Sequence, residues 1–177
     1  RAESLLVQFS FFGSYFIGSL FYFIYSYFKG APISKIGYKN GLLAGLILSA
    51  VGCFMFYPAA ELKIFGLFLA ALFVLALGFT LLQIAANPYV ALLGTPETAS
   101  SRLNMSQALN SFGTTIAPIL GGFLIFHYFA LQGNPLLNKA GDPILTDTGT
   151  SISAFGVQAP YIIFASIFLI LAVIFWR

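Results

Sequence analysis

The sequence predicts an all-α integral membrane protein with five transmembrane helices, on two observations. Hydrophobic residues make up 59% of the chain and charged residues only 7%, with a mean hydropathy of +0.94; a soluble domain carries about 25% charged residues. The charges also leave five uncharged intervals, at residues 4–28, 40–60, 64–96, 103–138 and 148–176. Each interval can hold the ~20 apolar residues that a helix needs to cross a bilayer.

Polar and turn-forming residues set the expected helix ends within these intervals. In order, the predicted helices occupy roughly residues 4–28, 41–57, 62–93, 103–129 and 158–176. Strands are excluded because the intervals are too long and lack an alternating pattern. The polar segment 130–157, with Asp142 and Asp147, is expected to form an extracytoplasmic loop.

The basic residues predict the orientation. Five of the eight would share one side of the membrane: Lys29, Lys35, Lys39, Arg102 and Arg177. Because short cytoplasmic loops are enriched in Lys and Arg, we place the 29–40 loop in the cytoplasm, and 131–157 and the amino terminus outside. The chain begins with Arg1 and shows no signal sequence, so we expect an internal fragment whose preceding helix is missing.

Two predicted helices match each other at a fixed offset, which indicates an internal repeat. Phe12, Gly13, Leu20 and Phe23 align with Phe112, Gly113, Leu120 and Phe123. The two helices would cross the membrane in opposite directions, as helices 2 and 5 of an inverted three-helix repeat do. With one helix in front, the five spans become helices 2–6 of a six-helix half.

Composition argues against several functional classes. The net charge of +3 is small and spread over loops, so no nucleic-acid partner is expected. His127 is the only histidine and Cys53 the only cysteine, and no acid lies inside a predicted span. We therefore expect no enzyme, no metal site and no cofactor, and we interpret Cys53 as a packing residue.

Amide side chains at membrane depth mark the candidate binding site. Gln83 and Asn87 would lie about 15 and 9 Å from the cytoplasmic end of their helix, at 1.5 Å per residue. On the next helix, Gln107, Asn110 and Thr114 would lie about 6, 10 and 16 Å in. Their spacing puts each set on one helical face. We therefore expect the two helices to be antiparallel neighbours whose amides meet at one depth.

Uncharged amides suit a neutral ligand rich in hydroxyl groups, because an amide both donates and accepts hydrogen bonds. Phe11, Phe12 and Tyr15 could provide an apolar platform for a sugar ring, and Gln8 is a further candidate lining residue. Pro88 would free a backbone carbonyl beside the amides. The alternative is that the amides only join one helix to the next.

Four motifs resemble one family of transporters. AANPY at 85–89 and RLNMSQALNSFG at 102–113 are similar to the paired signature of the fucose–galactose–glucose symporters of the major facilitator superfamily, and FYPAAE at 56–61 and IGYKNG at 36–41 resemble its earlier helices. The resemblance covers roughly residues 4–177 and is nearest to the bacterial glucose/galactose members. It implies a twelve-helix transporter with alternating access in a bacterial inner membrane, of which this chain forms helices 2–6 and needs the remaining helices as partners.

The resemblance also assigns roles to residues. The family's sugar-contacting amides fall on Gln107 and Asn110, and Gln83 stands where the proton-coupled fucose symporters carry an acid. The coupling ion, proton or sodium, stays open, as does uniport. Ser34 replaces the acid that is usual in the superfamily's cytoplasmic loop motif. The main functional prediction is transport of a neutral hexose, and the alternative is a transporter-like sugar sensor or membrane scaffold.

Overall fold

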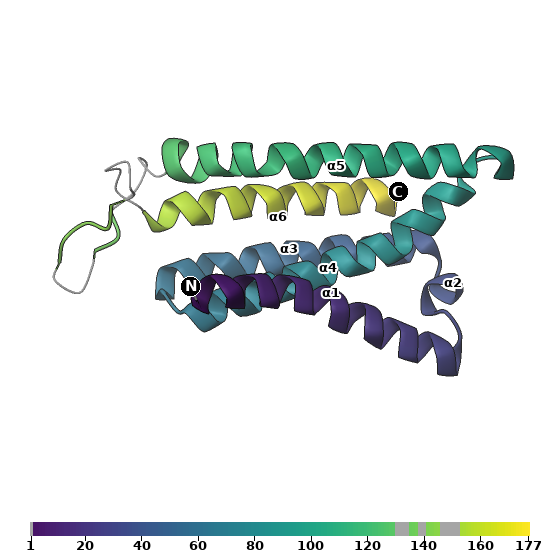
Figure 1. Ribbon diagram of the computed structural model, residues 1–177, viewed down its shortest axis with the longest axis horizontal. Coiled ribbons are helices and arrows are strands. Elements are labelled where there is room, and N and C mark those ends of the chain that lie inside the picture. Colours follow the sequence, from purple (N-terminus) through teal and green to yellow (C-terminus); the bar gives the residue numbers. More distant parts are fainter. Residues whose placement is uncertain (1, 130–134, 138–140, 146–152) are drawn as a thin grey trace.

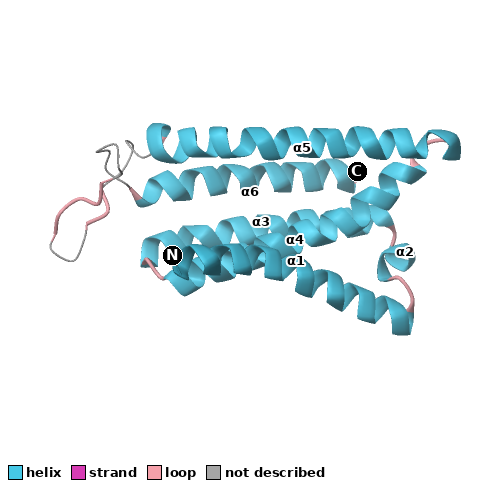
Figure 2. Cartoon of the chain, in the orientation of Figure 1, coloured by secondary structure: helices cyan, strands magenta, loops and turns pink. Residues whose placement is uncertain are grey.

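The computed structural model describes residues 2–129, 135–137, 141–145 and 153–177, and within them the predicted set of five membrane-spanning helices is confirmed (Figure 1). These helices are α1 (Ala2–Lys29), α3 (Tyr38–Leu62), α4 (Phe65–Leu92), α5 (Ala99–Phe123) and α6 (Ala154–Trp176). A π-helical turn, η2 (Leu124–Tyr128), extends α5. Two short elements, α2 (Pro32–Ile36) and the 3-10 turn η1 (Pro96–Thr98), lie in the connections (Figure 2).

Helices α3 and α6 extend beyond their predicted ends, and α1 and α5 also begin earlier than predicted, at Ala2 and Ala99. The helix expected at 41–57 runs from Tyr38 to Leu62, with Pro58 inside it. A proline removes one backbone hydrogen bond, which neighbouring helices and local adjustment can compensate inside a membrane. The helix expected to start at 158 begins at Ala154, because the Ser153 hydroxyl caps it by accepting a bond from the Gly156 N–H at 3.1 Å.

Most of the predicted extracytoplasmic loop at 130–157, Asp147 included, lies outside the described residues. The described parts form two isolated antiparallel bridges, between Pro135 and Ser153 and between Leu137 and Pro143. The sidedness of this loop stays a prediction.

Helices α3 and α4 form the centre of the fold. Helix α1 packs on α4, and α6 packs on α3. Helix α5 packs less closely than the other helices, and none of its residues is buried. It contacts α4 near the loop that joins the two helices, and its π-helical extension η2 contacts α6. In Figure 1, α4 runs alongside α1 and α3 and turns toward α5 at its carboxyl-terminal end.

The backbones of α3 and α4 approach each other closely where one helix presents a glycine. A Cβ atom at Gly52 would lie 2.5 Å from the backbone nitrogen of Leu75. A Cβ atom at Gly78 would lie 2.6 Å from the backbone nitrogen of Ser49. Small residues at such crossings allow the close packing that holds helices together in lipid.

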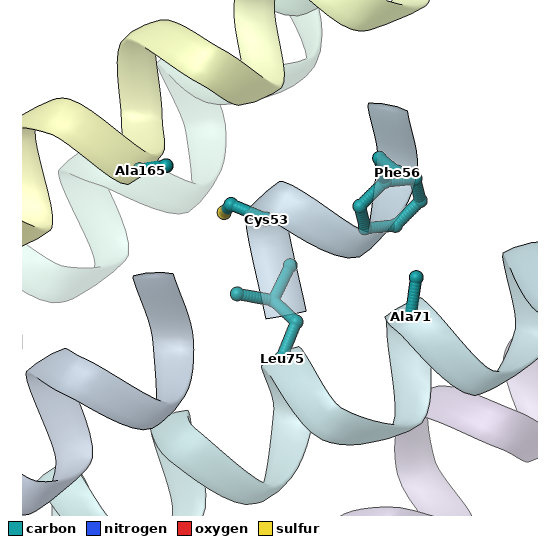
Figure 3. Packing of buried hydrophobic residues seen from close by; sticks show 5 residues of the cluster. All are labelled: Cys53, Phe56, Ala71, Leu75 and Ala165. Atoms are coloured by element: carbon teal, nitrogen blue, oxygen red, sulfur yellow. The ribbon is translucent and has the colours of Figure 1, made fainter. Parts of the chain in front are cut away.

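A buried cluster joins three helices at the centre of the molecule. Figure 3 shows Cys53 and Phe56 from α3 with Ala71 and Leu75 from α4 and Ala165 from α6. The ring of Phe56 stacks on that of Tyr161, with centroids 3.7 Å apart. Cys53 is 1% exposed, which confirms its predicted role in packing.

Candidate functional site

A cavity of about 490 Å³ lies between α1, α4 and α5 and contains most of the predicted site. All four predicted amides, Gln83, Asn87, Gln107 and Asn110, line it, and so do Thr114 and Tyr15. Its other lining residues are Phe11, Phe79, Leu82, Ala86 and Ser106. Within the described part of the chain, this cavity is lined by amide, hydroxyl and apolar groups and by no charged side chain.

One hydrogen bond joins the two helices inside the cavity. The Gln107 Nε2 donates to the Asn87 Oδ1 at 3.2 Å. The structure therefore brings one amide of each predicted set into contact, while their depth in the membrane stays a prediction. The same bond shows that Gln107 and Asn87 also serve as a link between α4 and α5.

The other two amides have no such link. Within the described chain, no hydrogen bond is made by the side chain of Gln83 or Asn110, and both residues are exposed. Each amide therefore offers a carbonyl oxygen and two N–H donors toward the cavity. The Thr114 hydroxyl donates to the Ser111 carbonyl at 2.8 Å, which leaves its oxygen free to accept.

Arg102, in the first turn of α5, is hydrogen-bonded to the end of α4, a contact that sequence reasoning missed. Its Nε donates to the Val90 carbonyl at 3.1 Å and its Nη2 to the Ala91 carbonyl at 2.6 Å. Its Nη1 donates to the Thr95 carbonyl at 3.2 Å. These carbonyls belong to the end of α4 and the following loop, where a cation is favoured by the helix dipole.

The aromatic wall differs in part from the prediction. Phe11 and Tyr15 line the cavity, with ring centroids 5.4 Å apart. Phe12 does not line it and is 67% exposed, because one residue further along a helix is rotated by about 100°. Gln8 is also absent from the lining. It shares the face of Phe11 but lies about one turn nearer the amino-terminal end of α1.

Four lining residues were not predicted, namely Phe79, Leu82, Ala86 and Ser106. The helical period would have found three of them on the side of the amides. Phe79 lies four residues before Gln83 and Ala86 three after it, and Ser106 lies four before Asn110. Residues that lie one helical turn from a predicted polar residue can therefore be predicted from the sequence as further lining residues of this site.

Comparison with known proteins gives the chain its relatives, although no protein-family profile matches it. The glucose/galactose transporter of Brucella abortus biovar 1 (strain 9-941) is 47% identical over 173 residues, which are 98% of this chain and 36% of that protein. The putative glucose/galactose transporter of Helicobacter pylori (strain ATCC 700392 / 26695) is 43% identical over 176 residues. The L-fucose-proton symporter of Escherichia coli (strain K12) is 39% identical over 153 residues.

Solved structures agree with this. A crystal structure of the E. coli fucose:proton symporter matches 99% of this chain with a TM-score of 0.69 and 32% identity. A second, of a major facilitator superfamily transporter in the outward conformation, matches with a TM-score of 0.70 and 34% identity. The chain belongs to the major facilitator superfamily. It spans 41% of the length of each of these superfamily structures and 36% of the Brucella relative.

The predicted resemblance to the fucose–galactose–glucose symporters is confirmed, because the relatives carry these names. The five spans are accordingly part of a major facilitator fold, with the cavity enclosed here by three of its helices.

Proposed function

We propose that the chain is part of a secondary active transporter that carries a neutral hexose across a bacterial inner membrane by alternating access. The relatives named for glucose and galactose support these sugars as substrates, and the relatives named for fucose support a third. Alternating access needs one helical bundle to move against another around a central site. The remaining helices of the full-length transporter would supply that second bundle.

The observation that carries the proposal is the uncharged cavity between α1, α4 and α5. Gln83 on α4 and Asn110 on α5 present amides with no partner in the described chain. We assign them the sugar hydroxyls, with Gln107 and Asn87 beside them. Each hexose hydroxyl both donates and accepts hydrogen bonds, as an amide group does. A sugar hydroxyl paired with an amide can therefore make its hydrogen bonds without a charged residue.

The aromatic side chains give the site a second type of contact. Phe11 and Tyr15 form an apolar wall beside the amides, against which the C–H face of a sugar ring can pack. Thr114 adds a hydroxyl on the side of α5. A cavity of about 490 Å³ is within the usual size range for a small-molecule site, about 300–1,000 Å³.

The proposal also includes coupling of sugar transport to the movement of an ion. The symporter relative is named for proton coupling, but the described lining contains no carboxylate, and Gln83 cannot take up a proton at neutral pH. A coupled proton would therefore need an acid elsewhere in the transporter, or the coupled ion would be sodium.

Uptake of radiolabelled sugar tests the proposal. The full-length transporter would be expressed in a strain that lacks other hexose carriers and supplied with labelled glucose, galactose and fucose in turn. Accumulation of one of them above the external concentration is expected. Binding of sugar to purified protein without uptake would instead indicate a sensor, and the absence of both would refute the proposal.

A second measurement identifies the coupling ion. In proteoliposomes, a pH gradient and a sodium gradient would be imposed separately. Proton coupling predicts uptake driven by the first gradient alone, and sodium coupling predicts uptake driven by the second. Net sugar flux down its own concentration gradient that neither ion gradient changes would show uniport.

A further inference from the structure

A second cavity, of about 440 Å³, lies on another side of α4, between α1, α3 and α4, and we call it the α1/α3/α4 groove. Its walls include Phe21, Tyr22 and Tyr25 from α1 and Leu77, Leu81 and Ile84 from α4. The groove shares no lining residue with the amide cavity, so sugar binding does not explain it.

The wall of the groove is apolar. Apart from the tyrosine hydroxyls, the only hydroxyl in the wall of the groove belongs to Thr80. The Thr80 hydroxyl already donates to the Ala76 carbonyl at 2.9 Å. Phe21, which lines the groove, is 72% exposed in this chain. A membrane-embedded opening with such walls favours a hydrocarbon chain over a polar solute.

Positive charge gathers at one end of the groove. Pro32, which starts α2, closes this end. The Lys29 ammonium lies 5.7 Å from the centre of the Tyr25 ring, and the Lys35 ammonium donates to the Lys29 carbonyl. The segment 29–40 carries a third lysine and no acid. The two ammonium groups are therefore unneutralised within their own segment, next to an apolar slot.

We propose that the α1/α3/α4 groove binds an anionic phospholipid, with one acyl chain along the groove and the phosphate between Lys29 and Lys35. Charge complementarity selects the lipid, because anionic headgroups concentrate in the leaflet that basic cytoplasmic loops face. A zwitterionic lipid fits the same walls but gains less from the two lysines. The lipid would tie α1 to α3 and α4 at the end where α2 joins them.

Native mass spectrometry of the full-length protein in detergent tests this site. Palmitoyl-oleoyl-phosphatidylglycerol is titrated against the phosphatidylcholine with the same chains. A lysine near the headgroup contributes about fivefold to the affinity for an anionic lipid, so Lys29→Gln and Lys35→Gln together should weaken phosphatidylglycerol about 25-fold. Phosphatidylcholine binding should stay unchanged. The matched control is Lys63→Gln, at the other end of α3. It should change the affinity for neither lipid.

A second variant tests the groove itself. Leu48 on α3 lines it, so Leu48→Trp should fill the space and lower the occupancy of both lipids. Val51→Trp, on the same helix and 46% exposed but outside the lining, is the matched control. Phosphatidylglycerol binding that survives the two lysine substitutions overturns the proposal even if Leu48→Trp does not fold. A dimer peak that Leu48→Trp removes would show a second copy in the groove and would also overturn it.

Discussion

The most direct test of the site removes the two amides that have no partner in the described chain. Gln83→Ala and Asn110→Ala each delete a group that would bind a sugar hydroxyl, and leave that hydroxyl unpaired. Such a loss costs about 1–3 kcal/mol. Because both residues are exposed in this structure, we expect the lower end, about fivefold in affinity for each and about 25-fold for the double variant.

The assay is titration of purified full-length protein with the transported hexose, alongside thermal unfolding of the same sample. Since neither amide bonds to the described chain, the melting temperature should change little. Gln158→Ala is the matched control: this buried amide donates to the Tyr57 carbonyl at 3.3 Å and to Glu61 Oε2 at 3.0 Å. It should lower the melting temperature and leave sugar affinity intact. Wild-type affinity in both test variants, with reduced stability, would refute the binding role.

Three further predictions concern the frame of the site and its orientation. Gly78→Ala should destabilise the protein by about 1–3 kcal/mol because its Cβ would lie 2.6 Å from a backbone nitrogen of α3; Gly122→Ala, with open space around it, should not lower the melting temperature. Arg102→Ala should lower the free energy of unfolding by about 1–2 kcal/mol and weaken sugar affinity, because it removes hydrogen bonds between α5 and α4. Arg102→Lys should not restore either property, because lysine lacks the forked donors of arginine. Full restoration by lysine would contradict this role. On intact cells, in a cysteine-free background, an impermeant thiol reagent should label Asn138→Cys and spare Ser34→Cys; the reverse pattern would invert the predicted topology.

The number of spans and the main site residues could be predicted from the sequence because both depend on local patterns. Charges cannot lie in hydrocarbon, so they delimit the spans. The helical period places Gln83 with Asn87, and Gln107 with Asn110, whatever the rest of the fold does. The short connection between the two helices then brought the two sets together, as the bond between Gln107 and Asn87 shows.

Other features depend on contacts between distant segments. Pro58 is a strong stop signal by itself, yet α3 continues past it to Leu62. Helix α5 makes few contacts with the central pair of helices, α3 and α4. This arrangement depends on how whole helices pack, and no local sequence pattern predicts it. Arg102 could have been noticed, since it lies just after a helix end rich in carbonyl groups, but its partners depend on the backbone path of the 93–98 connection.

The tight junction of α3 with α4 bears on how the chain is made. Only Lys63 and Ile64 separate the two helices, and their glycine contacts join residues that are close in sequence. Such local pairing forms quickly, since little chain entropy is lost in closing the loop. During synthesis, this helical hairpin can therefore assemble in the bilayer before α5 and α6 leave the ribosome. The α6 contacts reach back about a hundred residues to Tyr57 and Glu61, so they can form only after α6 has been made, on a hairpin that is already in place.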